Sequence, residues 1–227
     1  GIAACGVALT CYAASGKTLV ILGGSLMATV QHKVPLRATM AGFRRFTVKE
    51  YHKLIEIGVL TENDTLELLD GYLVEKMPHD PIHDGAIQLV EDAIRSLLPS
   101  SWCTRIQSAI TLTKSEPEPD LVVVRGNKRS FLSRHPGPSD FGIVFEVSNT
   151  SLDSDRDDKI PIYARDGIPV YWIVNLVDRQ VEVHEQPSGA TPSPSYGTRR
   201  TFKPGDSVPV VLDGTTVGTI PVVDLLP

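Results

Sequence analysis

Two short apolar runs constrain the fold of this chain more than any other feature of its sequence. DLVVV occupies residues 120–124 and GIVFEVS occupies residues 142–148, and both are rich in valine and other large apolar residues. Such runs are typical of strands that are buried on both faces, because a half-exposed strand alternates apolar and polar residues. We therefore expect these two runs to be central strands of one β-sheet.

Two segments predict local elements before this sheet. In FTVKEYHKLIEIG, residues 46–58, Thr47 and the glutamate three positions later form a capping-box pattern, and Gly58 is typical of a helix end. In TLELLDGYLVEKM, residues 65–77, the dipeptide Asp70-Gly71 tolerates the positive φ angles of a tight turn. The sequence therefore predicts a short helix followed by a β-hairpin.

The remaining segments complete a mixed α/β pattern. Residues 80–98 have the three-and-four apolar spacing of an amphipathic helix. Pro161 fits only the first turn of a second helix, which we expect to run from near Asp158 to Gly167. The other expected elements are strands at 104–112, 170–175 and 180–186, a loop at 125–140, an irregular excursion at 187–206 and strand pairs around Asp213-Gly214. This order predicts a central sheet with helices packed on it.

Residues 1–40 have a different character. They are apolar and rich in small residues. Lys17 interrupts the apolar run before it reaches the length of about 18 residues that is needed to span a bilayer. We interpret them as an extension outside the fold, caused by a reading frame that continues upstream of a start at Met27 or Met40. A signal peptide is the alternative. Residues 41–227 are then expected to form one domain.

The charge and the cysteine content exclude some classes of function. The formal net charge is −5, and because residues 1–40 hold three cations and no acid, residues 41–227 carry 19 lysines and arginines against 27 acids, a net −8. Broad electrostatic capture of nucleic acid needs clustered cations, so any phosphate-binding surface must be local or completed by metal ions. Cys5, Cys11 and Cys103 fit neither a disulfide framework nor a zinc pattern, which predicts a reducing, cytoplasmic setting without a membrane span.

Two acids stand out because they lie at the ends of the expected central strands. Asp120 opens the first apolar run, and Glu146 lies near the end of the second. Each could cap a turn or pair with an arginine, but carboxylates on adjacent strands are also the ligands that Mg²⁺ prefers. The aromatic residues that follow, Tyr163, Tyr171 and Trp172, are interpreted as core residues.

The residues after Glu146 raise the question of a missing lysine. Residues two apart on a strand share a face, so Ser148 points the same way as Glu146, at the place where the Glu-x-Lys triplet of metal-dependent nucleases puts a lysine. Lys159, at the start of the next helix, is able to send its side chain to that place. Alternatively, Lys159 forms an exposed i,i+4 pair with Asp155. The sequence leaves both interpretations open.

Several segments of the chain together carry a family resemblance. They are LELLDGYLVEKMP, the residue His83, PEPDLVVV and FEVSNTSLDSDRDDKIPIYARDGIPVYWIVN. From about Phe46 to Glu185 they resemble the Uma-two family of restriction-endonuclease-like proteins, which belongs to the PD-(D/E)xK nuclease superfamily and has an E-V-x-S-x-S/T segment in place of Glu-x-Lys. The resemblance implies an α/β fold with a restriction-endonuclease-like core, in which a central mixed β-sheet is flanked by helices, with an N-terminal helix and β-hairpin and a C-terminal β extension.

The resemblance also implies which residues act. Asp120 and Glu146 take the places of the two family acids, so they would bind Mg²⁺ or Mn²⁺, with the carbonyl of Val147 as a further ligand. Lys159 takes the place of a lysine that has migrated to the following helix, where it would activate the attacking water and stabilise negative charge. Two further family positions are matched by Glu67 and His83. A lone histidine at a helix start is more often a cap or a surface residue.

The activity that the resemblance implies is that of a metal-dependent endonuclease that hydrolyses phosphodiester bonds of DNA. We expect double-stranded DNA as the substrate and a homodimer as the assembly, because cutting both strands takes two active sites. The alternative is a catalytically inactive nuclease-fold protein that binds nucleic acid or a protein partner, and the net charge of −8 favours this alternative. A nucleophile-type hydrolase has little support, because the chain has no G-x-S-x-G motif.

Overall fold

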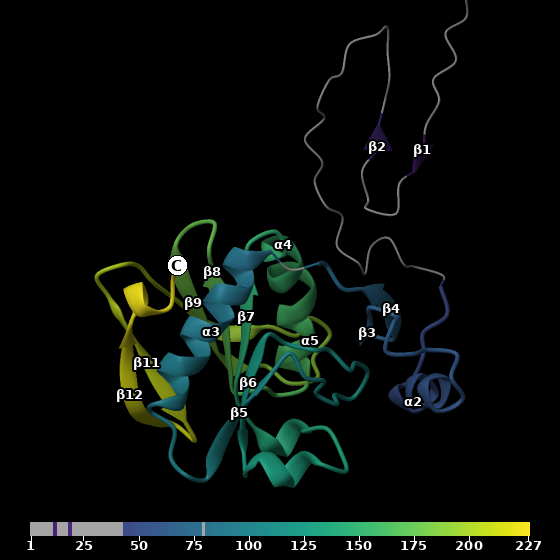
Figure 1. Cartoon of the computed structure of the whole chain (residues 1–227), viewed down its shortest axis with the longest axis horizontal. Coiled ribbons are helices and arrows are strands. Elements are labelled where there is room, and N and C mark those ends of the chain that lie inside the picture. Colours follow the sequence, from purple (N-terminus) through teal and green to yellow (C-terminus); the bar gives the residue numbers. More distant parts are fainter. Residues whose placement is uncertain (1–10, 13–17, 20–42, 79) are drawn as a thin grey trace, which may run out of the picture. The chain divides into compact units, whose positions relative to one another are not determined.

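The computed structural model describes residues 11–12, 18–19, 43–78 and 80–227 (Figure 1). The chain divides into two compact units, Gly1–Ala41 and Gly42–Pro227. In the first unit, β1 (Cys11–Tyr12) and β2 (Thr18–Leu19) form a two-stranded antiparallel sheet. The rest of the extension predicted at residues 1–40 lies outside the described residues. No helix within the described ranges is long and apolar enough to cross a membrane.

α2 is the first helix of the second unit and spans Val48–Glu56. The Thr47 hydroxyl accepts a hydrogen bond from the Glu50 amide, and the Glu50 carboxylate accepts one from the Thr47 amide. This reciprocal pair satisfies two donors that a helix start would otherwise leave open. Beyond the helix, Gly58 takes a φ of +73°, which glycine adopts without steric cost. The predicted capping box and helix end are therefore confirmed.

A β-hairpin follows α2, as predicted. β3 (Leu66–Leu69) and β4 (Tyr72–Glu75) pair antiparallel. The two residues between them, Asp70 and Gly71, have φ angles of +48° and +85°. Two consecutive positive φ angles match the right-handed twist of the flanking strands, so this dipeptide sets the register of the hairpin.

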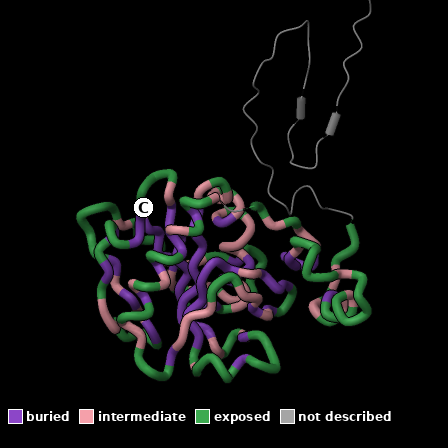
Figure 2. Tube along the Cα trace, viewed as in Figure 1, coloured by how far each residue is buried: buried purple, intermediate pink, exposed green. Residues whose placement is uncertain are grey.

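A six-stranded mixed sheet forms the centre of the second unit, with the strand order β10-β9-β8-β7-β6-β5 (Figure 1). Its strands in chain order are β5 (Trp102–Ile106), β6 (Leu121–Arg125), β7 (Phe141–Ser148), β8 (Val170–Asn175), β9 (Gln180–Pro187) and β10 (Tyr196–Phe202). β7 and β8 are parallel, and the other neighbouring pairs of this sheet are antiparallel. The two apolar runs are neighbouring central strands, and Figure 2 shows that buried residues concentrate in this sheet.

One face of the sheet is covered by α3 (Pro81–Arg95) and by the C-terminal hairpin of β11 (Ser207–Leu212) and β12 (Thr215–Pro221). The apolar stripe of α3 packs in one cluster with alternate residues of β6 to β9 and of the hairpin. Each large apolar side chain buried in this way contributes about 1.5–3 kcal/mol. Gly142 allows β7 to approach the hairpin, because a Cβ atom there would lie 2.7 Å from Leu212.

The opposite face carries the helical segment that crosses from β7 to β8. It consists of α4 (Leu152–Ser154), the π-helical turn η3 (Asp155–Lys159) and α5 (Ile160–Arg165). The predicted helix with Pro161 in its first turn is confirmed as α5, which begins at Ile160, but the helical turns that precede it from Leu152 were missed. Pro161 has no amide hydrogen and its ring crowds the carbonyl four residues earlier, and a widened turn relieves this conflict. The proline lies in the first turn of α5, directly after the wide turn of η3.

The strand predicted at residues 104–112 is wrong beyond Ile106. Gln107 takes a φ of +43°, at the point where the regular pairing of β5 ends. Ile110 and Leu112 are buried, but in a loop that folds back on itself. Their apolar spacing reflects burial in a loop, which a strand pattern alone cannot distinguish.

The irregular excursion predicted at residues 187–206 is also wrong in part, because it contains β10. This strand pairs with β9 at the edge of the sheet, and its residues are exposed or intermediate in burial. An edge strand that buries neither face needs no apolar alternation, so its sequence gives no strand signal. The hairpin around Asp213-Gly214 is confirmed. The predicted loop at 125–140 holds two short 3-10 turns, η1 (Lys128–Phe131) and η2 (Pro138–Asp140), and a third, η4 (Val222–Asp224), follows β12.

Candidate active site

The two predicted metal-binding acids lie directly opposite each other on neighbouring strands. The register that pairs Leu121 with Phe145 places Asp120, just before β6, across from Glu146 on β7. Facing residues of an antiparallel pair point to the same side of the sheet. Asp120 Oδ2 accepts a hydrogen bond of 2.7 Å from the Val147 amide, and both carboxylates are buried, with 6% and 3% exposure.

Lys159 reaches this pair of acids from the following helical segment. Its Nζ atom lies 3.0 Å from Glu146 Oε1 and 3.2 Å from Asp155 Oδ1. Both contacts considered from the sequence therefore exist together. The interpretation of the Asp155 pair as an exposed helix contact is wrong, because Asp155 is 1% exposed. The wide turn η3 turns both residues towards the sheet.

Asp155 is a member of the site that sequence reasoning had placed on the surface. Its Oδ2 atom accepts hydrogen bonds from the hydroxyls of Ser148, at 2.7 Å, and Ser151, at 2.6 Å. The Tyr171 hydroxyl donates to the Asp155 carbonyl at 3.2 Å. Ser148, which stands where the Glu-x-Lys triplet has its lysine, thus fixes the acid that contacts Lys159.

Tyr163 is a second contributor that sequence reasoning missed, since it was assigned to the core. It is fully buried and packs edge to face on Tyr171, with ring centroids 4.9 Å apart, so the core assignment describes its ring. Its hydroxyl, however, donates a hydrogen bond of 2.7 Å to Glu146 Oε1. The available signal was its spacing, because residues four apart on a helix share a face and Tyr163 follows Lys159 by four.

His83 and Glu67, the two further candidates, also lie at this end of the sheet. His83 Nε2 is 3.3 Å from Asp120 Oδ2, while the His83 amide donates to the Asp80 side chain that caps α3. It therefore both belongs to a helix start and contacts the acid. Glu67 on β3 is 7% exposed, and its carboxylate accepts a hydrogen bond of 3.1 Å from the Glu118 amide.

Burial and charge shift the pKa values of this cluster. Burial raises the pKa of Glu146 well above its usual range, the negative charges of Asp155 and Asp120 raise it further, and Lys159 only partly offsets them. Burial by itself would lower the pKa of Lys159, but the neighbouring carboxylates raise it well above its ordinary value. Lys159 is therefore a cation at neutral pH. The pKa of His83 is raised as well, because its bond to Asp120 outweighs its burial.

The donor set fits one kind of metal ion. Mg²⁺ is held in proteins by one or two carboxylates, with water and substrate phosphate completing its shell, and the facing carboxylates of Asp120 and Glu146 match that requirement. Within residues 43–78 and 80–227, no group of three or more histidine, cysteine, aspartate or glutamate side chains is arranged to hold a metal. The site fits a hydrated hard cation and not a metal enclosed by protein ligands.

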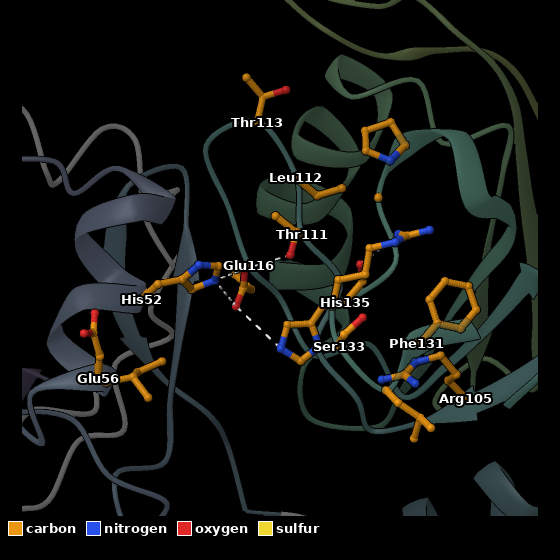
Figure 3. Close-up of a pocket in the computed structure, with 15 residues that line it drawn as sticks. His52, Glu56, Arg105, Thr111, Leu112, Thr113, Glu116, Phe131, Ser133 and His135 are labelled. Atoms are coloured by element: carbon orange, nitrogen blue, oxygen red, sulfur yellow. Dashed lines mark hydrogen bonds and ion pairs between the residues drawn. The ribbon is translucent and has the colours of Figure 1, made fainter. Parts of the chain in front are cut away.

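A pocket of about 920 Å³ lies elsewhere on the second unit, beside α2 (Figure 3). On its wall the buried carboxylate of Glu116 pairs with His52 Nε2 at 2.7 Å, and His135 Nε2 lies 3.9 Å from the same carboxylate. Much of the remaining wall is apolar and includes Leu132, which is 83% exposed. The acids and the lysine predicted from the sequence are not among the residues that line this pocket.

Comparison with known proteins places the chain in a family. Residues 48–218 match the Uma2 family, which is described as "Putative restriction endonuclease". The protein belongs to the Uma2 family. The match extends past the region from Phe46 to Glu185 that carried the resemblance, and it includes β10 and most of the C-terminal hairpin.

A solved structure shows that the fold is shared. The Uma2 chain is similar to a protein from Anabaena variabilis described as a "putative nuclease belonging to DUF820", with a TM-score of 0.60 and 14% sequence identity, over 79% of this chain and 97% of that one. No functionally curated protein matches the sequence. The family match and the mixed sheet confirm the predicted restriction-endonuclease-like α/β fold.

Proposed function

We propose that this Uma2 protein is a metal-dependent endonuclease that hydrolyses phosphodiester bonds of DNA. The observation that carries the proposal is the convergence of three charged groups from three elements: Asp120 before β6, Glu146 on β7 and Lys159 from η3. The cost of burying these charges is several kcal/mol, which a purely structural role does not require. Family membership supports the assignment to nucleases.

Each side chain has a role that follows from its contacts. Asp120 and Glu146 would hold Mg²⁺ or Mn²⁺, with the Val147 carbonyl as a further ligand. When bound, the cation lowers the pKa of water and offsets charge on the scissile phosphate. The Lys159 ammonium lies beside the carboxylate pair, where it donates hydrogen bonds to the attacking water or to the negative charge that develops on the phosphate.

Four neighbours keep these groups in place or charged. His83 contacts the Oδ2 atom of Asp120 and so orients its carboxylate, and the Val147 amide fixes the same atom. The Tyr163 hydroxyl holds Glu146 Oε1. Glu67 adds a negative charge that keeps Lys159 protonated. Residues of this kind, which orient the groups that touch a cation, typically change activity by about 10-fold to 100-fold when they are replaced.

The proposed substrate is double-stranded DNA, and the proposed assembly is a homodimer whose two sites cut one strand each. The net charge of −8 over residues 41–227 limits the number of phosphates that the protein neutralises. The proposed divalent cation and the Lys159 ammonium then supply part of the attraction for the DNA phosphates.

Cleavage of supercoiled and linear DNA tests this proposal. We expect nicked and linear products with Mg²⁺ or Mn²⁺, no products with a chelator, and loss of cleavage in Asp120→Ala with the fold retained by circular dichroism. RNA and single-stranded DNA of the same sequence serve as competing substrates. Cleavage that persists unchanged in Asp120→Ala would remove the proposed role of the carboxylates.

A second candidate function is that of a nuclease-fold protein that binds a partner without cutting DNA. The pocket beside α2 favours it, since exposed apolar side chains such as Ile55 and Leu132 line a cavity away from the acids. Calorimetric titration of Mn²⁺ into wild type and Asp120→Ala separates the two candidates. Binding that depends on Asp120 supports the nuclease, whereas a purely binding protein has no need of a carboxylate-dependent cation site.

A further inference from the structure

Among the residues that the structure describes, the carboxylates around Lys159 outnumber the cations that contact them. Lys159 lies within 3.2 Å of both Glu146 and Asp155, and its pKa also responds to Glu67. Asp120 faces Glu146 across the strand pair and adds to the repulsion there. A single ammonium shared by two buried carboxylates leaves room for further positive charge.

The two carboxylates that share Lys159 are held in different ways. The Oδ2 atom of Asp155 receives hydroxyls from Ser148 and Ser151, which leaves Oδ1 turned towards the ammonium. The contact atom of Glu146, in contrast, is Oε1, which receives both Lys159 and the Tyr163 hydroxyl. Asp155 is therefore locked into an ion pair with Lys159, while Glu146 also faces Asp120 and the proposed cation.

We infer that Lys159 is an internal counter-ion of the cation site. Its ammonium pairs with Glu146 when no cation is bound, and it stays paired with Asp155 when a cation binds Glu146. The inference rests on the cation site of the proposed function and adds how that site is regulated. The exchange needs no long movement, because Lys159 gives up a contact of 3.0 Å and retains one of 3.2 Å.

The same geometry assigns a purpose to the serine that stands in place of the expected lysine. Ser148 touches neither Lys159 nor Glu146 through a described hydrogen bond, but its hydroxyl holds Asp155 at 2.7 Å. It acts as a positioning residue, because it orients the Asp155 carboxylate that pairs with Lys159. Loss of this hydroxyl is expected to weaken the ion pair between Asp155 and Lys159 without changing any charge.

Removal of the Lys159 charge is expected to strengthen cation binding at Glu146. Lys159→Met keeps the length and apolar stem of the side chain and removes the charge that competes for Glu146, so Mn²⁺ should bind at least about tenfold more tightly than to wild type. Without a cation this variant should melt at a lower temperature, because the acids lose their partner. Mn²⁺ should then raise its melting temperature by more than it raises that of wild type.

Ser148→Ala distinguishes an exchange of partners from simple electrostatics. In the wild-type background it should weaken Mn²⁺ binding about fivefold, because the ammonium stays longer on Glu146. In the Lys159→Met background, Ser148→Ala should have no effect on Mn²⁺ binding, because no ammonium is left for Asp155 to hold. Ser154→Ala is the control, since the Ser154 hydroxyl likewise donates to an aspartate of the helical segment, Asp158, at 3.1 Å.

The experiment is calorimetric titration of Mn²⁺ into the full chain of wild type, Lys159→Met, Ser148→Ala, the double variant and Ser154→Ala, together with melting curves with and without Mn²⁺. Tighter binding by Lys159→Met and an effect of Ser148→Ala that vanishes in its presence support the inference. Equal effects of Ser148→Ala in both backgrounds, or no gain in Lys159→Met, overturn it. If Lys159→Met does not fold, Lys159→Gln takes its place in the same comparison.

DNA cleavage is measured separately so that the two proposals fail independently. The coupling between Ser148 and Lys159 is the dependence of the Ser148→Ala effect on the presence of Lys159. If wild type cleaves DNA with a cation but this coupling is absent, the counter-ion inference is overturned and the nuclease proposal stays intact. The coupling without cleavage by any variant supports the counter-ion inference and overturns the nuclease proposal.

Discussion

Glu146 and Glu182 lie in one row on the same face of the central sheet, since each pairs with Ile173 of β8 from opposite sides. Both are buried, with 3% and 0% exposure. Glu182 contacts two guanidiniums, those of Arg156 and Arg199, and it also accepts hydrogen bonds from neighbouring amide side chains. Glu146 instead shares one ammonium with another acid.

The pKa values express this difference in partners. Burial alone would raise the pKa of Glu182, but the nearby His184 ring and hydrogen bonds from Arg156 and amide groups bring it far below its ordinary value. The pKa of Glu146 is instead raised well above its ordinary value, because its burial and two nearby acids outweigh Lys159. Burial of an acid thus does not mark a functional site by itself. A shortage of positive charge around the acid is the distinguishing feature.

The largest expected effect separates the two acids by activity. Glu146→Gln should reduce DNA cleavage about a thousandfold, because it removes the charge that holds the cation. Glu182→Gln should leave cleavage nearly unchanged but lower the free energy of unfolding by about 1–3 kcal/mol, because its partners lose charge-assisted hydrogen bonds. Plasmid cleavage and chemical denaturation of the two variants measure this. Equal loss of cleavage in two folded variants would contradict the distinction.

The histidines beside Asp120 and Glu182 give the next largest effect. His83→Asn should reduce cleavage about 10-fold to 100-fold, because Asp120 loses one of the two groups that orient it but keeps the Val147 amide. His184→Asn is the matched control beside Glu182 and should stay within about twofold of wild type. Single-turnover cleavage rates measure both. A loss in His184→Asn as large as that in His83→Asn would show that the loss comes from general destabilisation.

A smaller effect is expected in the dependence of stability on pH. Since the folded pKa of Glu182 lies below its ordinary value of 4.5, its stabilising contribution is complete above that pH and is lost as the pH falls below it. Glu146 has a raised pKa, so its contribution has the opposite sign and is lost as the pH rises. The melting temperature, measured without cations from neutral to acidic pH, should therefore fall more steeply below pH 4.5 for wild type than for Glu182→Gln. Parallel curves would contradict the assignment of Glu182.

The smallest effect is expected at the pocket beside α2. Leu132→Ser changes an exposed side chain away from the carboxylates, so cleavage should remain within about twofold of wild type. Ile55→Ser is a second variant of the same wall. A loss of cleavage comparable to that of His83→Asn would show that the pocket takes part in binding DNA.

Much of the fold was predictable because local patterns dominate it. The capping box at Thr47, the Asp70-Gly71 turn and the two apolar runs each specify an element with few residues. β10 was not predictable, because an edge strand buries little apolar surface. The early start of the helical segment at Leu152 was missed, because the wide turn before Pro161 has no simple sequence signal.

Prediction of the candidate site was limited by long-range geometry. Asp120, Glu146 and Lys159 came from strand positions and from a family resemblance, and the structure brings them together. The double contact of Lys159 was not predictable, because the sequence offers its two acids as alternatives. Tyr163 and Asp155 were missed because a buried tyrosine and an i,i+4 acid have common structural roles, and their polar atoms find partners only after the segment folds onto the sheet.

The most direct measurement is cation-dependent cleavage of plasmid DNA by Lys159→Ala beside wild type. Lys159 contributes the positive charge next to the carboxylate pair, so the variant should remain folded and bind Mn²⁺ while it cleaves at least about a hundredfold more slowly. Cleavage at the wild-type rate by a folded Lys159→Ala would contradict the account, because the amine would then have no part in the reaction.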